Sequence, residues 1–527
     1  MIASAIAIAG ALACSHSAGA AAGAPVRPPF PHGVVGIAAN GNFTPGDLPA
    51  IASAGAGVIR ANLNWNRMQP HQGGPIDWSE SDALMTRAAK NGLNVEWTVA
   101  TTPRWARSSP RANLWDPPLS SEVARDGWQQ FLARAAARYG QGGRFWTSQP
   151  GLARPRVYWQ VWNEPSCAKR WDGPPSAREY ADLLHLSSPV IRANDPAARI
   201  ITGGLFTQCT PTSYLNHFYR FANRSDFDMV GSHPYEDSPY QVYSQIQHLR
   251  GVIDRAGDQR TGIWIDEIAW FAPGANGRKA QAQNLRILFQ MLATHRAELG
   301  VRGLLWFGYR DNPDAAGCVF CRHSGLIQYD GSPKPSLHLF TGFTQPAATV
   351  MGKVTDRHGG PLAHDKIYLD LNGNGELDRG EPTTRTNPDG LYSFHHLLGA
   401  ETYKVHLIPR AGQHCIPIES CTRPVRAPEP ATVGEAAFSL SVPQTLTVAK
   451  TGDGSGSIRG PGLNCASMCR HVYQRGALIS LKAVPEPGSV FAGWQGQACT
   501  TARRPSCRLH PHSKRGVVAV FNPSPGG

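Results

Sequence analysis

"VYWQVWNEPSC" (157–167) is an apolar, aromatic run that ends in Asn163, Glu164 and Pro165. Tryptophan and β-branched residues favour a strand, and Pro165 has no N–H for a sheet ladder, so we expect the strand to stop before it. Glu164 would then be a carboxyl group at the carboxy-terminal tip of a strand, among bulky aromatic side chains. The alternative from this stretch alone is a surface glutamate before a turn.

Seven further runs repeat this apolar pattern between residues 33 and 345, and helical patterns separate them. Before the last run, for example, Leu285, Leu288 and Leu292 recur at helical spacing. Eight strands that alternate with helices predict a (β/α)₈ TIM barrel, whose active site lies at the carboxy-terminal strand ends. The seven other predicted strands are 33–39, 57–65, 93–101, 199–205, 228–235, 261–270 and 303–309.

Two β-rich modules are expected after the barrel. Residues 347–441 contain short strands and turns such as "NPDG" (387–390) without a convincing helix, which predicts a β-sandwich. Residues 444–522 are again β-like, with the Gly-rich turn "GDGSGS". The predicted fold class is therefore multidomain, with boundaries near Gln345 and Pro443.

A second strand tip carries a carboxyl group like that of Glu164. Glu267 lies in "WIDEIAW" on the seventh predicted strand, and Asp266 precedes it. Because side chains alternate along a strand, we expect only one of these two to point into the site. Two carboxylates across a barrel mouth are what glycoside hydrolysis requires, one as acid and base and the other as nucleophile or as base toward water.

These motifs resemble clan A glycoside hydrolases, through "WNEP" on strand four and a glutamate on strand seven. The runs 58–85 ("VIRANLNWNRMQPHQGGPIDWSESDALM") and 99–106 ("VATTPRWA") resemble family 39 in particular, and family 5 is a near neighbour. The resemblance implies cleavage of β-linked sugars with retention and without a cofactor. It makes Glu164 the general acid/base and Glu267 the nucleophile.

Further roles follow from the same resemblance. Asn163 would bond the sugar 2-hydroxyl, and Arg60 would hold the nucleophile ionised. His233 and Tyr235 would line the site near the nucleophile. The structural alternatives are a core histidine for His233 and a structural carboxylate partner for Arg60. The tryptophans expected to offer faces to sugar rings, if they are not ordinary packing, are Trp65, Trp105 and Trp306.

The two glutamates are expected to lie close together. Retention needs carboxyl groups at about 5–5.5 Å, whereas inversion needs about 6.5–9.5 Å. Repulsion at the shorter range, and burial among Trp159 and Trp162, predict a raised pKa for Glu164.

The middle module contains a predicted calcium loop, "DLNGNGELDRGE" (370–381), in which Gly375 is the sixth residue. With "TNPDGLYSF", this loop makes the module resemble the B-type β-sandwich repeats of Gram-positive adhesins, which implies calcium binding. An acidic hairpin turn is the alternative. The candidate metal ligands are Asp370, Asn372, Asn374, Glu376, Asp378 and Glu381.

The last module resembles the divergent B-repeat of internalin-type surface proteins. The net charge of the chain is +13, and the residues from Gln444 onward include ten basic and only two acidic ones. A basic patch can hold an anionic polymer, and an acidic cell-wall glycan is a better partner for a secreted chain than nucleic acid. A solvated basic face is the alternative.

Residues 1–24 resemble a secretory signal, with the apolar run "IASAIAIAGALAC" before small residues, although the basic start is missing. Cys14 is an alternative lipidation site. No other run approaches the roughly 18 apolar residues that span a bilayer. In a secreted chain the other ten cysteines predict disulfides rather than zinc, in the pairs Cys167–Cys209, Cys318–Cys321, Cys415–Cys421, Cys465–Cys469 and Cys499–Cys507.

The function predicted from these residues is a secreted or surface-associated retaining glycoside hydrolase that acts on a polysaccharide or oligosaccharide. The alternatives are a non-catalytic carbohydrate-binding or adhesin protein and a transglycosylase. No nucleotide or protease motif of the kinds GxxxxGK[ST], HExxH or GxSxG occurs in the chain.

Overall fold

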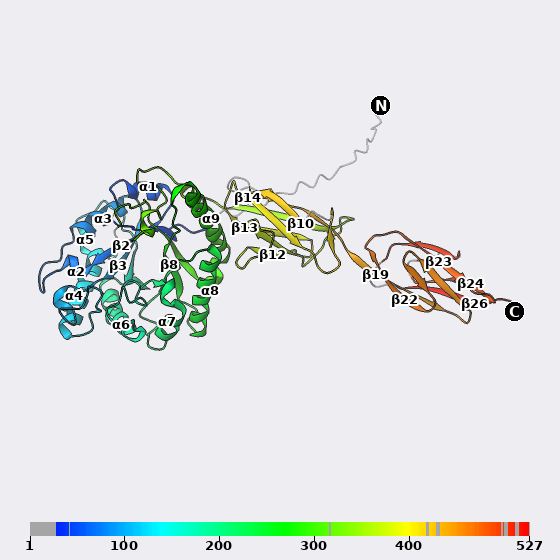
Figure 1. Ribbon diagram of the computed structural model, residues 1–527, viewed down its shortest axis with the longest axis horizontal. Helices are drawn as coiled ribbons and strands as arrows, with labels where there is room; N and C mark the ends of the chain where they lie inside the picture. The colour runs from blue at the N-terminus through cyan, green and yellow to red at the C-terminus, as the bar shows by residue number, and fades with distance from the viewer. Residues whose placement is uncertain are drawn as a thin grey trace, which may run out of the picture.

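Three units follow one another along the chain, a barrel and two β-rich modules (Figure 1). The computed structural model describes residues 28–41, 43–315, 318–417, 421–427, 433–496, 499, 504–511 and 516–525. The predicted signal segment, residues 1–24 with Cys14, lies outside them.

The first unit is a closed parallel barrel, which confirms the predicted fold. β1 pairs with β2 on one side and with β9 on the other, and β5 meets β7 to complete the ring. The two-residue strand β6 (Leu205–Phe206) adds to β7. Each predicted strand overlaps one strand of the barrel, although the last one, predicted at 303–309, begins two residues earlier. The strands are β1 Val35–Ala38, β2 Val58–Asn64, β3 Asn94–Ala100, β4 Val157–Val161, β5 Arg199–Thr202, β7 Met229–His233, β8 Gly262–Ile268 and β9 Val301–Phe307.

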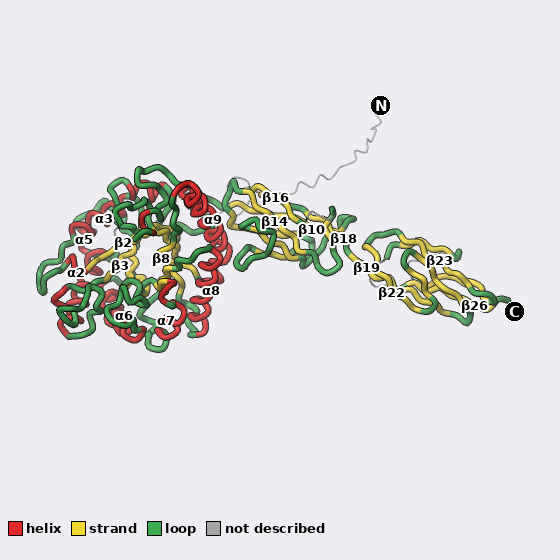
Figure 2. Tube along the Cα trace, viewed as in Figure 1, coloured by secondary structure: helices red, strands yellow, loops and turns green. Residues whose placement is uncertain are grey.

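Helices surround the barrel strands, as the red and yellow segments of Figure 2 show. Local sequence explains where some begin: the Ser176 side chain accepts from the Glu179 N–H at the start of α6, and Ser238 with Gln241 forms a capping box for α8. The helices are α1 Asp47–Ser53, α2 Trp65–Met68, α3 Ser79–Lys90, α4 Glu122–Tyr139, α5 Arg144–Thr147, α6 Ala177–Asn194, α7 Pro211–Phe218, α8 Pro239–Arg255, α9 Gly274–Leu299 and α10 Pro335–Phe343. Short 3₁₀ segments lie at Arg104–Ala106, Thr207–Cys209 and Phe320–Arg322.

The barrel interior changes from apolar to charged toward the carboxy-terminal strand ends. Side chains on one face of a strand recur every second residue, so the residues two positions further on form the next layer. On β2, β4 and β8 these residues are Arg60, Gln160 and Asp266, all buried. The apolar layer beneath them includes Val58, Tyr158, Ile201, Met229, Trp264 and Leu305.

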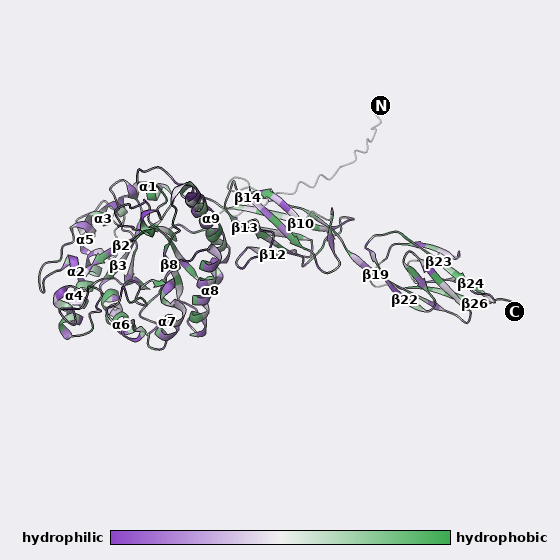
Figure 3. Cartoon of the chain, in the orientation of Figure 1, coloured by the Kyte–Doolittle hydropathy of each residue, from purple (hydrophilic) through white to green (hydrophobic). Residues whose placement is uncertain are grey.

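The two β-rich modules each contain two sheets (Figure 1). In the middle module the strand orders are β13-β10-β18-β15, with β17 on β10, and β12-β11-β14-β16. In the last module they are β22-β19-β26-β24 and β21-β20-β23-β25. Hydrophobic residues mark the strands of both modules (Figure 3).

The predicted boundary residue Gln345 lies between α10 and β10, and Pro443 is the first residue of β19. In the middle module the strands are β10 Ala348–Asp356, β11 Lys366–Asp370, β12 Thr383–Arg385, β13 Leu391–Leu397, β14 Thr402–Ile408, β15 His414–Cys415, β16 Thr422–Arg426, β17 Val433–Glu435 and β18 Phe438–Ser441. In the last module they are β19 Pro443–Thr451, β20 Gly456–Gly460, β21 Leu463–Cys465, β22 Met468–Gln474, β23 Ile479–Pro485, β24 Ser489–Gln495, β25 Ser506–Leu509 and β26 Val517–Pro523.

The middle module is attached to the barrel more closely than the last module is. Barrel residues such as Phe343 and module residues such as Leu398 belong to one hydrophobic cluster. Gln290 on α9 also accepts from the Tyr403 hydroxyl at 3.0 Å and donates to the His396 carbonyl at 3.0 Å. The last module has a separate core, which includes Trp494.

The structure joins the ten cysteines that follow Cys14 in the five pairs expected from the sequence. Within the described residues, no helix has the length and apolar character needed to cross a bilayer.

Candidate active site

The turn after β4 places Glu164 at the barrel mouth. Trp162 and Glu164 both have a left-handed backbone, with φ of 71° and 48°. Such backbone is uncommon outside glycine and gathers at functional sites. The buried Trp162 indole donates to the Arg170 carbonyl at 2.8 Å, which fixes the turn. The Glu164 side chain remains 15 % exposed.

Asp266 and Glu267 at the end of β8 both reach Arg60 on β2. The Glu267 Oε1 lies 2.5 Å from Arg60 Nη1, and the Asp266 Oδ2 lies 3.5 Å from Arg60 Nε. The expectation that only one would point inward is wrong, because the register between β8 and β9 shifts between Ile265 and Ile268 and breaks the alternation. Glu267 is the one at the mouth, 13 % exposed, while the Asp266 side chain is fully buried.

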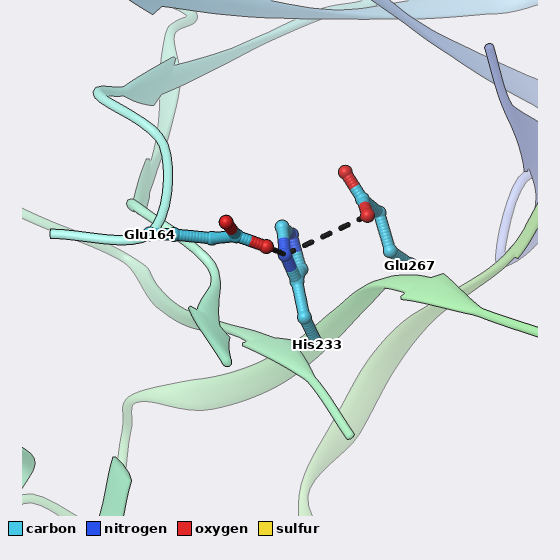
Figure 4. Close-up of side chains that lie close together, drawn as sticks. All are labelled: Glu164, His233 and Glu267. Carbon is cyan, nitrogen blue, oxygen red and sulfur yellow. Dashed lines mark hydrogen bonds and ion pairs between the residues drawn. The ribbon is translucent and has the colours of Figure 1, made fainter. Parts of the chain in front are cut away.

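His233, the last residue of β7, lies between Glu164 and Glu267 (Figure 4), and Asp266 approaches its other ring nitrogen. Its Nδ1 is 2.9 Å from Glu164 Oε1 and 3.7 Å from Glu267 Oε2, and its Nε2 is 3.1 Å from Asp266 Oδ2. One oxygen of Glu164, one of Glu267 and the His233 nitrogen all lie within 4.8 Å of one another. The Tyr235 hydroxyl donates to Glu267 Oε2 at 2.9 Å.

Arg60 ties β2 to β3, β4 and β8. Its Nη2 donates to Gln160 Oε1 and to Asn163 Oδ1, both at 2.7 Å, and its Nε lies 3.1 Å from Glu96 Oε1. Burial alone would lower the pKa of Arg60, but the charges of Glu267, Asp266 and Glu96 outweigh it and raise the pKa above its ordinary value. Arg60 therefore stays charged and stabilises the ionised form of its partners.

The charges around His233 set the protonation of the site. Burial would lower the pKa of His233, but Glu267 and Asp266 raise it to about 10. Burial would raise the pKa of Glu164, but the hydrogen bond and charge of His233, followed by the charges of Arg170 and Arg60, hold it below its ordinary value. The expected rise in the pKa of Glu164 is thus wrong, because the nearest charged group is an imidazolium.

Two buried polar residues beneath the mouth were missed by the sequence predictions. Glu96 on β3 accepts from the Trp264 indole N–H at 2.7 Å, and burial, with repulsion from Asp266, raises its pKa to about 8. Gln160 on β4 accepts from Thr98 at 2.8 Å and donates to Asp266. Inward alternation could have found both, since Glu96 is the register partner of Arg60 in the pairing of β2 with β3.

The predicted sugar-binding tryptophans need correction. Trp65 is completely buried among residues that include Trp105 and Trp128, and Trp306 is completely buried between β9 and the helices. Neither ring has a face that a sugar reaches, so both leave the candidate site. Alternation on β9 explains Trp306, because it turns Phe307 inward instead. Trp105 is partly exposed and stays a predicted contact.

Aromatic residues line the Glu267 side of the mouth instead. The Tyr235 ring lies 6.2 Å from Phe307, 5.1 Å from Phe320 and 5.8 Å from Phe206, measured between ring centroids. All four are partly exposed. They offer the apolar surface that the sequence analysis assigned to tryptophan.

The glycine pair after β5 makes room for the site. A Cβ on Gly204 would lie 2.1 Å from His233 Nε2, and one on Gly203 would lie 2.7 Å from the Pro165 ring. The small residues at these positions therefore let His233 and the turn after β4 pack together.

The predicted calcium loop of the middle module lies against the barrel helix α8. Glu381 accepts from the Leu371 N–H at 2.7 Å and from the Tyr240 hydroxyl of α8 at 3.3 Å. The side-chain amides of Asn372 and Asn374 both donate to Asp378 Oδ2 at 2.8 Å.

The carboxylates of this loop sit close enough to repel one another. Burial raises the pKa of Glu381 to about 7, with further contributions from Asp370 and Asp378, whereas Glu376 is exposed. Among the described residues, the group of three acidic or histidine ligands close enough to share an ion is Glu164, His233 and Glu267, so the loop side chains do not converge in this way.

Comparison with known proteins matches one module to a known family. Residues 446–525 match the family model described as the divergent InlB B-repeat domain. A search of curated protein sequences finds no match to the chain.

Solved structures with a similar fold include glycoside hydrolases. A family 39 glycoside hydrolase from Bacteroides cellulosilyticus is 17% identical over 76% of this chain and 78% of its own, with a TM-score of 0.49. A GH39 enzyme from Xanthomonas axonopodis pv. citri is 15% identical over 71% and 92%, with a TM-score of 0.47. A GH39 β-xylosidase from Caulobacter crescentus is 15% identical over 83% and 84%, with a TM-score of 0.45.

Proposed function

We propose that the protein is a glycoside hydrolase that cleaves a β-linked glycan with retention of configuration. The observation that supports this best is the pair of carboxylates, since one oxygen of Glu164 and one of Glu267 lie within 4.8 Å. Retaining enzymes hold the two groups at about 5–5.5 Å, and inverting enzymes separate them to about 6.5–9.5 Å to admit a water.

Glu267 is the nucleophile in this proposal. One of its oxygens attacks the anomeric carbon as the bond from that carbon to the leaving oxygen breaks, which leaves a glycosyl ester on Glu267. Arg60, 2.5 Å away, favours the charged carboxylate, and the Tyr235 hydroxyl, 2.9 Å away, orients it. Asp266 and Glu96 act one layer deeper, as positioning residues for Arg60.

Glu164 is the acid and base, and His233 supplies its proton. Because His233 has a raised pKa and Glu164 a lowered one, the pair holds one proton at neutral pH, mainly on the imidazole. That proton passes along the hydrogen bond between Nδ1 and Glu164 Oε1, whose heavy atoms are 2.9 Å apart, and from Glu164 it goes to the leaving oxygen. In the second step Glu164 removes a proton from the water that cleaves the ester, and the proton returns to the pair.

Asn163 is the proposed contact to the sugar 2-hydroxyl. Arg60 occupies its Oδ1 at 2.7 Å, so the amide N–H groups remain for the substrate. A bond that strengthens in the transition state contributes to catalysis rather than to binding alone.

The accessory modules extend the proposal. Secretion rests on the apolar start of the chain, and wall-glycan contact rests on the basic residues of the last module. For the middle module, the oxygen donors of the 370–381 loop and its mutually repelling carboxylates support a calcium ion, which would draw these side chains together. Its ligands would be Asp370, Asn372, Asn374, Glu376, Asp378 and Glu381, and the ion would order this loop against α8.

The activity is tested by incubating the purified protein with a panel of β-glycans and aryl β-glycosides. We expect new reducing ends from at least one substrate and none from Glu267→Ala protein. Product analysis also separates hydrolysis from transglycosylation. Absence of turnover on the whole panel, or equal turnover by Glu267→Ala protein, would contradict the proposal.

A further inference from the structure

The mouth has a rim on the Glu164 side that is built by two loops, residues 101–121 after β3 and 162–175 after β4. Arg170 lies at its inner edge, with Nε 3.4 Å from Glu164 Oε2 and its guanidinium carbon 4.7 Å from the Trp115 ring centre. Asp172 accepts from the Asn113 backbone N–H at 3.0 Å and from its side chain at 2.8 Å. The two loops are therefore joined directly beside Glu164.

Positive charge exceeds negative charge on this rim. Apart from Glu164 it carries two carboxylates, Asp116 and Asp172, and both accept bonds from N–H groups. Across the ion pairs found in the described residues, the only rim cation involved is Arg170, and its partner is Glu164 itself. The five rim cations are Arg104, Arg107, Arg111, Lys169 and Arg170.

The electrostatic environment of Arg107 agrees with this excess. Burial, followed by the charge of Arg104, lowers the pKa of Arg107, although Asp116 and Asp172 act in the opposite direction. The loop after β7 has the opposite character, because Glu236 and Asp237 lie side by side there and burial, followed by Asp237, raises the pKa of Glu236. The Glu164 side of the mouth is thus more positive than the loop after β7.

The side of the mouth decides which part of the substrate meets this charge. An acid that protonates the glycosidic oxygen must lie beside the leaving group, so the rim next to Glu164 faces the leaving-group sugar. Planar guanidinium groups match carboxylates in geometry and charge.

We infer that the leaving-group sugar carries a carboxylate, so that the substrate is an acidic, uronate-containing β-linked glycan. This inference rests on the proposed function and adds the substrate class. A carboxylate on Arg170 would also share the cation that now contacts Glu164, which favours the protonated form of that acid as substrate binds. The last module is also positively charged, like the rim, so one acidic polymer could bind both regions.

The test needs a matched pair of substrates that differ only in charge on the leaving-group side. Two aryl glycosides of one hydrolysed sugar provide it, the 4-nitrophenyl and the 3-carboxy-4-nitrophenyl derivatives. For the wild-type protein we expect kcat/KM to be about fivefold to tenfold higher on the carboxylated compound at low salt, with the preference falling as salt screens it.

The rim variant is Arg104→Gln/Arg111→Gln, in which both residues are exposed and make no ion pair within the described residues. The matched control is Arg156→Gln/Arg260→Gln, two exposed arginines before the starts of β4 and β8, at the opposite end of the barrel. The rim variant should lose part of the preference through a higher KM, because Arg170 remains, and its kcat on the neutral compound should be unchanged. The control should keep the full preference.

A polymer arm uses uronate-containing β-glycans and their carboxyl-reduced derivatives, with faster cleavage of the acidic member expected. Equal kcat/KM on both aryl glycosides, or a preference that is undiminished in the rim variant, would overturn the inference, and neither result would affect the proposed hydrolase activity. Absence of turnover on every glycoside would instead contradict the proposed function.

Discussion

The protein gathers carboxylates in two places, the barrel mouth and the 370–381 loop. The two places differ in whether cations of the protein compensate the negative charge. At the mouth, Glu164, Asp266 and Glu267 have buried cations of the protein beside them, Arg60 and His233. In the loop, the ion-pair partner found for the acids within the described residues is His406, 3.3 Å from Asp370, and burial lowers the pKa of that histidine.

The difference separates two uses of the same residue type. A hydrolase needs acids whose charge the protein sets itself, because protonation decides which one attacks and which one donates. A loop whose acids repel one another without a cation gains stability when an ion arrives from solution. The mouth is therefore complete as it stands, whereas the loop is expected to respond to calcium.

The largest expected effect is the loss of the nucleophile. Glu267→Ala should lower kcat/KM by roughly 10⁴-fold or more, since the covalent step disappears. Azide should restore part of the rate by entering the space of the carboxylate, and it should give the glycosyl azide of opposite anomeric configuration. Glu80→Ala, which removes an exposed helix glutamate, is the control and should behave as wild type. A wild-type rate for the Glu267→Ala protein would show that the carboxylates at the mouth are not catalytic, and this side of the comparison would fail.

Removing the acid should have a smaller, substrate-dependent effect. Glu164→Ala should lower the rate by roughly 10²–10⁴-fold on substrates with poor leaving groups, because general acid catalysis contributes that much. Substrates with good leaving groups, such as dinitrophenyl glycosides, should lose far less in the first step. A plot of rate against leaving-group pKa tests this, and equal slopes for variant and wild type would contradict the role of Glu164.

Calcium should act on the loop without entering the chemistry. Extracellular calcium modules bind at about 10⁻⁴–10⁻³ M, so about 10 mM calcium should stabilise the middle module by about 1–3 kcal/mol. Calorimetry of the full chain with and without chelator measures this, because the module shares its core with the barrel. Asp378→Asn/Glu381→Gln should abolish the shift, while Asp389→Asn, an exposed acid of the same module, should keep it. An unchanged melting profile would show that the loop needs no ion.

The smallest predicted effect concerns Glu96, the buried acid beneath the mouth. Burial and Asp266 raise its pKa from 4.5 to about 8, so the folded protein keeps a proton that the unfolded chain releases between these values. The free energy of unfolding should therefore fall as pH rises through that window. Urea denaturation at pH 5, 7 and 9 should show a weaker pH dependence for Glu96→Gln than for wild type. If the free energy of unfolding depends on pH in the same way for both proteins, the titration of Glu96 does not contribute to stability.

The sequence predicted the barrel and the set of residues at its mouth because both follow from short repeating patterns. Apolar runs marked the eight strands, and strand tips carried Glu164, Glu267 and His233, which converge once the ring closes. What failed depended on contacts between distant segments. The shift near Asp266 requires the neighbouring strand β9, and the lowered pKa of Glu164 requires His233, 69 residues away.

The tryptophan error has a similar physical cause. A tryptophan near the end of a strand, or just after it, looks the same in sequence whether its ring faces the mouth or the helices. On β9 the alternation that buries Leu305 inside the barrel sends Trp306 outward and Phe307 inward. Counting from the apolar layer would have corrected this residue.

The most direct test of the central claim is the anomeric configuration of the first product, followed by proton NMR during hydrolysis of an aryl β-glycoside. The close approach of Glu164 and Glu267, within 4.8 Å, predicts that the β-anomer appears first and then equilibrates with the α-anomer. First appearance of the α-anomer would show inversion, and it would contradict the assignment of Glu267 as a nucleophile beside Glu164.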